Sequence, residues 1–387
     1  MFMLFERYLQ TSVFDDLAEE MVVLTGPRGV GKTTLAKQVL TMESNGLYLS
    51  WDDRSHRRAI MDSSWPEGEA LLVLDELHKW RRYKKWLRDE IESHGDRLRF
   101  LVVQGGELEG QLLDEAVRSY RLHPYSVGEI APANAGHLQV DKEIPIGATG
   151  EPEALEALLE TGGFPKTFAA KRAGTRKRWR RERLERFFGE DVRDVAPIRD
   201  WASLELFAEL IPKMVGKPLS LNTMREDLGV SHRALTHWMG LLQRLFFVFQ
   251  VRPYAAESIR ALTKLPKVYL WDWTLVSDPK ARYENLVAVH LLKLCHYFQD
   301  RDGLSTELYY IRDRNKREVD FLVTWGGQPW FAVQTHLTDH HIRTPLRYFT
   351  DRLQIPWAYQ LVRDGQRDYV KDGIRSIPAD RFLPALV

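Results

Sequence analysis

The chain of 387 residues has one cysteine, Cys295, and a formal net charge of only +1. A single cysteine excludes an internal disulfide and a cluster of metal-binding thiolates, and it suits a reducing compartment, so we expect a cytoplasmic protein. Because the chain is no polycation, any surface for nucleic acid has to be a local patch. No apolar run reaches the roughly 20 residues that span a bilayer. Residues 1–14 lack the basic start and long apolar core of a signal peptide, so we expect no membrane attachment.

A glycine-rich segment at residues 26–34 is the strongest signal that is present. It matches the pattern G-x-x-x-x-G-K-[ST], follows an apolar strand predicted at 21–24 and precedes a helix-forming stretch at 34–40. In that context the loop N–H groups and the positive end of the helix bind phosphates. A plain glycine turn is the alternative. The residues expected to bind ATP or GTP are Gly26, Pro27, Arg28, Gly29, Val30, Gly31, Lys32, Thr33 and Thr34.

A second apolar run, at residues 71–76, ends in two carboxylates. Buried parallel strands read as continuous apolar runs, and ligands bind at their carboxyl ends. We expect Asp75 to hold Mg²⁺ through water, and Glu76 to polarise the water that attacks the γ-phosphate. A solvated carboxylate at a strand end is the alternative for Glu76. Together with the loop, this run predicts catalytic roles for Lys32 and Glu76 and a metal site at Thr33 and Asp75.

Two further segments follow in order, Tyr-Arg-Leu-His-Pro-Tyr-Ser-Val-Gly-Glu at 120–129 and Gly-Gly-Phe-Pro at 162–165. With the loop and the Leu-Asp-Glu run, they resemble the bacterial and archaeal AAA+ superfamily ATPases that carry a C-terminal domain of unknown function. The resemblance covers nearly the whole chain. It implies ATP and Mg²⁺ as cofactors, and a ring or other homo-oligomer in which a neighbouring subunit supplies an arginine. It also implies adenine rather than guanine, and no guanine-reading Asn-Lys-x-Asp motif is present.

Two positions depart from the pattern of that family. The family senses the γ-phosphate with a polar residue, commonly a small hydroxyl, after the strand that follows the Asp-Glu pair. Here that strand, predicted at 98–103, is followed by Gln104. The family's Gly-Arg pair is replaced by Asp-Glu-Ala-Val-Arg at 114–118, which leaves Arg118 as the candidate arginine finger and Arg121 as its alternative. These departures bear on the hydrolysis rate more than on nucleotide binding.

The most basic stretch of the chain spans residues 171–186. Trp179, Leu184, Phe187 and Phe188 recur near helical spacing in or just after it, so we expect a helix with one buried stripe and outward arginines. Two interpretations stay open. The arginines contact phosphates of DNA or RNA, or they form a solvated face or meet acidic residues of a neighbouring subunit.

Residues 219–228 and 232–244 predict two helices joined by a glycine turn, which is a helix-turn-helix. Strands predicted at 245–249 and 267–270 would complete a winged helix. In DNA-binding versions, the front of the second helix contacts bases and phosphates. A structural or subunit-contact module is the alternative. The outward positions expected at that front are Ser231, His232, Arg233, Thr236 and His237.

The C-terminal region shows a different pattern. An amphipathic helix is predicted at 281–292, followed by strands at 308–312, 318–323 and 329–336. This order resembles the restriction-endonuclease core, whose active members hold Mg²⁺ with carboxylates and position the attacking water with a lysine. The matching residues are Glu284, Asp320, Gln334 and His336. Neutral Gln334 is a poor Mg²⁺ ligand and His336 does not replace a permanently charged lysine, so we expect metal-dependent cleavage to be lost or very weak.

The sequence therefore predicts an α/β protein with four regions. These are an AAA+ P-loop ATPase domain at 1–135, a helical lid and linker at 136–200, a winged helix at 201–275 and a degenerate restriction-endonuclease-like domain at 276–387. We expect an oligomer that hydrolyses ATP to remodel or translocate on DNA. It would bind DNA through the winged helix, the stretch 171–186 or the C-terminal domain. The alternative function is a nucleotide-switched regulatory ATPase that binds a protein partner and does not move on DNA.

Overall fold

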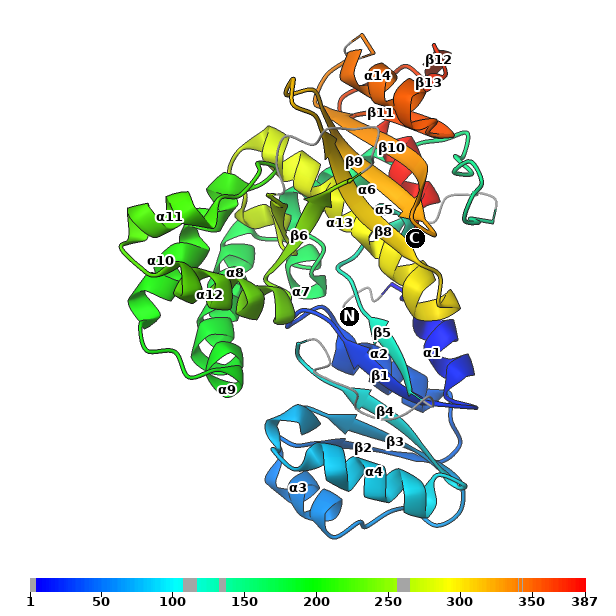
Figure 1. Cartoon of the computed structure of the whole chain (residues 1–387). Coiled ribbons are helices and arrows are strands. Elements are labelled where there is room, and N and C mark those ends of the chain that lie inside the picture. The colour runs from blue at the N-terminus through cyan, green and yellow to red at the C-terminus, as the bar shows by residue number, and fades with distance from the viewer. Residues whose placement is uncertain (1–4, 107–116, 132–136, 256–264, 340, 343) are drawn as a thin grey trace. The chain divides into compact units, whose positions relative to one another are not determined.

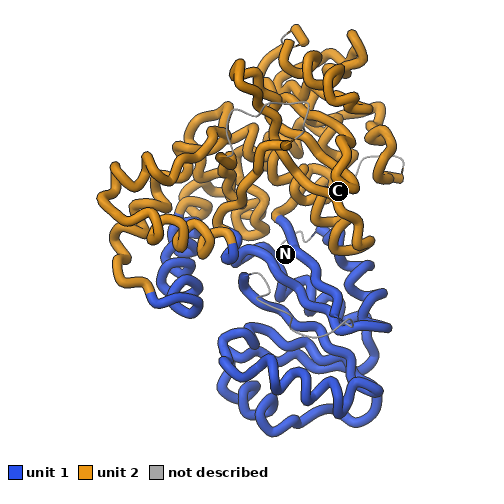
Figure 2. Tube along the Cα trace, viewed as in Figure 1, with its two compact units in different colours: residues 1–123, 178–197, 244–246 blue, residues 124–177, 198–243, 247–387 orange. Residues whose placement is uncertain are grey.

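The computed structural model describes residues 5–106, 117–131, 137–255, 265–339, 341–342 and 344–387. The chain forms two compact units (Figure 2). Unit 1 comprises residues 1–123, 178–197 and 244–246, and unit 2 comprises the remainder. The described residues contain no helix that is both long enough and apolar enough to cross a bilayer.

Unit 1 is built on a five-stranded sheet with the order β2-β3-β4-β1-β5, in which every neighbouring pair is parallel. The strands predicted at 21–24, 71–74 and 98–103 are confirmed, because the apolar runs of β1, β3 and β4 are almost completely buried. Five parallel strands place their carboxyl ends along one edge. The bounds are β1 (Met21–Thr25), β2 (Gly46–Ser50), β3 (Ala70–Asp75), β4 (Leu98–Val103) and β5 (Val117–Arg121).

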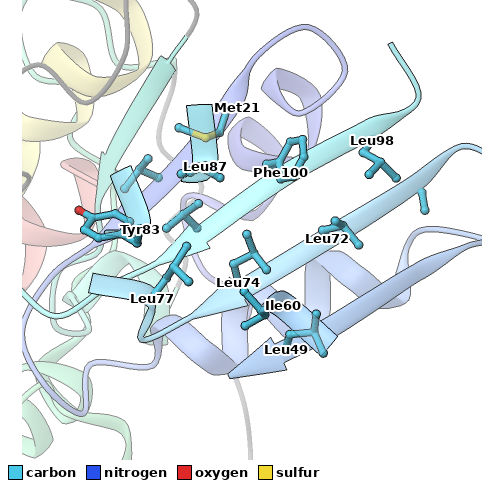
Figure 3. Packing of buried hydrophobic residues seen from close by; sticks show 13 residues of the cluster. Met21, Leu49, Ile60, Leu72, Leu74, Leu77, Tyr83, Leu87, Leu98 and Phe100 are labelled. Carbon is cyan, nitrogen blue, oxygen red and sulfur yellow. The ribbon is translucent and has the colours of Figure 1, made fainter. Parts of the chain in front are cut away.

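Helices pack on this sheet because alternate strand residues point to opposite faces. One face carries a cluster in which Leu72, Leu74 and Phe100 meet Ile60 and Leu87 of two covering helices (Figure 3). Burying each such side chain contributes roughly 1.5–3 kcal/mol. The helices of this part are α1 (Gln10–Asp16), α2 (Lys32–Thr41), α3 (Arg54–Met61), the short 3-10 helix η1 (Leu77–Lys79) and α4 (Tyr83–His94).

The basic stretch forms helix α8 (Ala173–Arg186), as predicted. It continues through a π-helical turn at 187–191 into α9 (Val192–Val195). Phe187 is buried, whereas Trp179 and Leu184 are half-buried, so the expected apolar stripe is present but shallow. A π-turn is rare and often occurs at functional positions.

Unit 2 contains an eight-stranded mixed sheet with the order β12-β13-β11-β10-β9-β8-β6-β7 (Figure 1). The predicted strands at 308–312, 318–323 and 329–336 are confirmed as β8, β9 and β10. Neighbouring pairs are antiparallel from β8 to β10 and parallel between β10 and β11. The bounds are β6 (Val248–Pro253), β7 (Lys267–Leu270), β8 (Thr306–Arg312), β9 (Glu318–Trp325), β10 (Gln328–His336), β11 (Trp357–Val362), β12 (Tyr369–Lys371) and β13 (Ile374–Pro378).

The long helix α13 (Pro279–Asp302) packs on this sheet. It extends ten residues beyond the predicted end at 292, because its buried residues continue to Phe298 and its stop signal is Gly303, in the left-handed conformation at φ 67°. Asp278 caps its start by accepting a hydrogen bond from the Ala281 N–H at 2.8 Å. The other helices are α5 (Val127–Ile130), α6 (Pro152–Thr161), α7 (Pro165–Phe168), η4 (Trp273–Leu275), α14 (Thr344–Leu353), α15 (Ala379–Phe382) and η5 (Leu383–Ala385).

The predicted pair of helices is present as α11 (Leu221–Leu228) and α12 (His232–Arg244), preceded by α10 (Trp201–Leu210) and η3 (Ile211–Met214). Ser220 caps α11, and Gly229 takes the left-handed conformation that ends it. The strand expected at 245–249 begins instead at Val248 and runs to Pro253. It pairs antiparallel with β7 and, at two positions, parallel with β8. The proposed wing is therefore also part of the C-terminal sheet. The winged-helix and restriction-endonuclease assignments, and the domain boundaries, stay predictions.

Candidate functional site

The glycine-rich loop follows the carboxyl end of β1 and leads into α2. Gly26, Gly29 and Gly31 have φ angles of 140°, 81° and 108°, a region that side chains disfavour. A Cβ atom at Gly26 would lie 2.5 Å from the carbonyl oxygen of Leu122, so only glycine fits there. The backbone thus has the curvature that presents N–H groups to an anion at the start of a helix.

Lys32, the first residue of α2, is buried in this loop. Its Nζ donates hydrogen bonds to the carbonyl oxygens of Gly26 at 2.7 Å and Pro27 at 3.2 Å. Burial lowers the pKa of Lys32, and the charges of Glu76 and Asp75 oppose that shift. The ammonium is therefore held inside the loop, at the place where phosphate oxygens would bind.

The two predicted metal ligands, Thr33 and Asp75, meet in the structure. Thr33 Oγ1 donates to Asp75 Oδ2 at 2.7 Å, and the hydroxyl of Tyr48 donates to the same oxygen at 2.8 Å. Among the described residues, the other carboxylate oxygen, Asp75 Oδ1, is buried and accepts no hydrogen bond. Burial raises the pKa of Asp75, opposed by the hydrogen bonds from Thr33 and Tyr48. A hydroxyl beside a buried carboxylate oxygen with spare capacity fits Mg²⁺, which prefers oxygen ligands.

Glu76 follows β3 in a left-handed conformation, with φ 58° and ψ 22°. Such a conformation costs on the order of 1 kcal/mol for a residue other than glycine and is common at functional sites. Its carboxylate lies 3.0 Å from Lys79 Nζ and 3.8 Å from His78 Nε2. Burial lowers the pKa of His78 against the opposing charge of Glu76, so that imidazole is neutral near pH 7. Glu76 is thus held by an ion pair with Lys79.

Gln104 lies between the loop and Asp75, because β4 separates β1 from β3 in the sheet. Its backbone N–H donates to the carbonyl of Leu24 at 3.1 Å. The side chain is buried, and within the described part of the chain its Oε1 has no hydrogen-bond partner. This position suits the γ-phosphate sensor implied by the resemblance. That role stays a prediction.

In unit 2 the structure brings the predicted nuclease residues only partly together. Gln334 Nε2 donates to Asp320 Oδ2 at 2.8 Å, and Glu284 on α13 approaches them through Lys267. Burial raises the pKa of Glu284 to about 7, opposed by the charge of Lys267. His336 is buried at the end of β10. No group of three or more His, Cys, Asp or Glu in the described ranges is arranged to hold a metal ion.

Comparison with known proteins assigns the first of these sites to a family. Residues 18–131 match the family described as AAA domain. These residues are similar to that family, and we refer to them as the AAA domain. Residues 152–278 and 280–382 match two families described as domains of unknown function, DUF8612 and DUF4143. The resemblance to an AAA+ ATPase with a C-terminal domain of unknown function is thereby confirmed, and the match indicates nucleotide binding.

Similar proteins extend this comparison. An uncharacterised protein of Mycobacterium tuberculosis is 22% identical over 383 residues, covering 94% of this chain and 81% of that protein. The guanylate kinase of Dechloromonas aromatica is 27% identical over 123 residues, covering 28% of this chain and 61% of the kinase. A Walker-type ATPase of Pyrococcus abyssi has a TM-score of 0.42 at 13% identity, covering 73% of this chain and 96% of that chain.

Arg118 does not approach the nucleotide loop of the AAA domain. It lies opposite Val22 near the amino end of β1, whereas the loop follows the carboxyl end. Its Nε lies 3.2 Å from Asp16 and 3.3 Å from Glu20, which balance its charge. A role toward a neighbouring subunit stays a prediction, and residues 114–116 of the atypical segment lie outside the described residues.

Contacts between distant segments complete the loop of the AAA domain. Arg28 Nη2 lies 2.6 Å from Asp191 Oδ1 and 2.8 Å from Glu190 Oε2, both in the π-turn after α8. A Cβ atom at Gly29 would lie 3.1 Å from Trp179 Cζ2 of α8 itself. No local pattern links Arg28 with a residue so far along the chain. The contact of Tyr48 with Asp75 is easier to predict, since Tyr48 lies on the strand beside the one that ends in Asp75.

Proposed function

We propose that the AAA domain hydrolyses ATP with Mg²⁺ as its cofactor. The observation that supports this best is the meeting of Thr33 and Asp75 at 2.7 Å beside the loop, with Asp75 Oδ1 left to accept a further ligand. When bound, Mg²⁺ would neutralise charge on the phosphates. Lys32 would exchange the loop carbonyls for phosphate oxygens. Glu76 would orient the attacking water and take up its proton.

Two substitutions test this proposal. Lys32→Ala removes the phosphate-binding ammonium, and Glu76→Gln removes the base but keeps the shape. We expect each to lower the rate of phosphate release from ATP by about a hundredfold or more. Glu76→Gln should still bind ATP in a filter or fluorescence assay. The matched controls are Lys85→Ala and Glu92→Gln on the exposed face of α4. Turnover that survives Lys32→Ala or Glu76→Gln would contradict the proposal.

We propose further that hydrolysis drives work on DNA by an oligomer. Support comes from the front of α12, which exposes polar and basic side chains where helix-turn-helix proteins contact DNA. Those exposed residues are Ser231, His232, Arg233, Thr236 and His237. Helix α8 is a weaker candidate, because Arg178 and Arg181 lie 3.9 and 3.4 Å from the carboxylates of Glu182 and Glu185. Such internal pairs favour a solvated face over phosphate contact.

A second candidate function is a nucleotide-switched regulator that binds a protein partner. The contact that favours it is the ion pair of Arg28 with Glu190 and Asp191. Phosphates in the loop would compete with those two carboxylates for positive charge, so nucleotide binding would alter the contact between the loop and the π-turn. Such a switch needs no DNA.

A further inference from the structure

A buried lysine lies among the carboxylates of unit 2 that a nuclease of this pattern would use for metal. Lys267, the first residue of β7, is fully buried. Its Nζ lies 2.8 Å from Glu318 Oε1, 3.4 Å from Glu284 Oε1 and 3.9 Å from Asp320 Oδ1. Three carboxylates from α13 and β9 thus converge on one ammonium group.

The same carboxylates also accept hydrogen bonds from other donors. Asp320 Oδ2 accepts from Gln334 Nε2 and from the N–H and hydroxyl of Thr335, at 2.7–2.8 Å. Glu284 Oε1 accepts from the hydroxyl of Tyr269 at 2.8 Å. Glu318 Oε2 accepts from Arg312 Nη1 at 2.9 Å. Each of the three carboxylates therefore accepts a hydrogen bond from another protein donor and also faces Lys267.

Contacts around β7 hold Lys267 in this place. The side-chain amide of Asn285 on α13 accepts from the N–H of Leu270 at 2.9 Å and donates to its carbonyl at 2.7 Å, which ties β7 to the helix that carries Glu284. Gly216, at φ 75°, closes over the group, since a Cβ atom there would lie 2.8 Å from Glu284 Oε1. The lysine is part of a closed and well-anchored centre.

With Lys267 in place, the site does not fit a divalent metal ion. Mg²⁺ takes about six oxygens at 2.0–2.1 Å, whereas the nearest carboxylate oxygens surround Lys267 Nζ at 2.8–3.9 Å, the spacing of ammonium contacts. A second cation beside a buried ammonium would also be repelled in a medium of low polarisability.

We propose that Lys267 is the resident cation of this site and excludes divalent metal from it, and that removing its ammonium creates a site for one divalent cation. Glu284, Glu318 and Asp320 would then be the ligands of that cation. The loss of metal chemistry expected from Gln334 and His336 thereby gains an independent cause, from a residue outside the predicted set. This proposal does not depend on ATP hydrolysis by the AAA domain.

The test uses the full chain, free of nucleotide, with Mn²⁺ as the probe. Asp75→Asn serves as the background, so that the AAA domain contributes no cation site. In that background we expect no Mn²⁺ binding that depends on Asp320, measured from the signal of free Mn²⁺ by electron paramagnetic resonance. The Asp75→Asn, Lys267→Ala double variant should bind one Mn²⁺ at least about tenfold more tightly than the Asp75→Asn background does. A further Asp320→Asn substitution should abolish that binding.

Thermal melting covers the case in which Lys267→Ala folds poorly. Bound Mn²⁺ should raise its midpoint and leave the background unchanged, because a ligand stabilises only the state that binds it. Lys267→Met keeps the length of the side chain and removes its charge. This variant therefore distinguishes the effect of the space left by the lysine from the effect of its charge on Mn²⁺ binding.

Absence of Mn²⁺ binding by folded Lys267→Ala would contradict the proposal, and two further outcomes would overturn it. The first is Mn²⁺ binding to the background that Asp320→Asn abolishes. The second is DNA cleavage with Mg²⁺ that both Lys267→Ala and Asp320→Ala abolish, which would make Lys267 a catalytic lysine that has moved to another strand.

Discussion

At the scale of single residues, two carboxylates lie beside the phosphate loop and would repel the phosphates of a nucleotide that binds there. Glu190 and Asp191 accept hydrogen bonds from the guanidinium of Arg28, and Asp191 is half-buried. Burial raises the pKa of Asp191 against the charge of Arg28, as expected for a carboxylate held partly out of water. A nucleotide brings several further negative charges to the same loop.

We therefore predict that Asp191→Asn tightens nucleotide binding. Removing one negative charge near the phosphates should contribute about 1 kcal/mol, or roughly a fivefold lower dissociation constant. A fluorescent ATP analogue measures it, and the effect should shrink at high salt. Glu185→Gln on the exposed face of α8 is the matched control. Weaker binding by Asp191→Asn would show instead that this residue shapes the loop.

At the scale of elements, α13 is joined to α5 by a buried imidazole. His290 Nε2 accepts from the N–H of Val127 at 3.1 Å, and its Nδ1 lies 2.8 Å from the carbonyl of Leu286, to which it donates. The contact with Val127 requires the neutral ring, because a protonated Nε2 cannot accept a hydrogen bond. Burial lowers the pKa of His290 to about 4, the charge of Lys293 adds to this shift, and Glu129 opposes it.

This centre predicts acid sensitivity. Between pH 6.5 and about 4 the unfolded chain binds a proton at His290 and the folded chain does not, so stability falls as pH falls through this range. A shift of this size corresponds to roughly 3 kcal/mol. Urea unfolding across this range measures the slope, and His290→Gln, which keeps a donor and an acceptor, should flatten it. An unchanged slope in that variant would assign the sensitivity to other groups.

How well an element or a site could be predicted depended on how local its determinants are. The loop at 26–34 and the Asp75–Glu76 pair were predictable, because strand, turn and helix signals adjoin in sequence. The pairing of Thr33 with Asp75 followed from the shared edge of parallel strands. Asp191 and Lys267 were not predictable, since tertiary packing alone brings them to Arg28 and Glu284.

At the scale of the whole molecule, the proposed ATP hydrolysis would be coupled to DNA. We predict that duplex or branched DNA raises the rate of phosphate release several-fold. Binding should weaken steeply with salt, because phosphate contacts release counterions. Arg233→Ala at the front of α12 should reduce this stimulation and leave the DNA-free rate unchanged. Arg54→Ala, at an exposed position of α3, is the control.

Oligomer mass with and without nucleotide completes this experiment. A nucleotide-dependent oligomer that DNA stimulates supports the motor function. If DNA changes neither rate nor mass and one protein partner is captured instead, the regulatory function is the better description.

The strand order of the eight-stranded sheet also limits which segments of this protein can be exchanged by recombination. Residues 152–278 and 280–382 match separate families, yet β6 and β7 from the first pair into the sheet of the second (Figure 1). Lys267 lies in the first segment, and the carboxylates that it neutralises lie in the second. A swap of either segment alone in recombination would leave an open sheet edge and unbalanced buried charge. The two segments should therefore be inherited together, or their charges should change in concert.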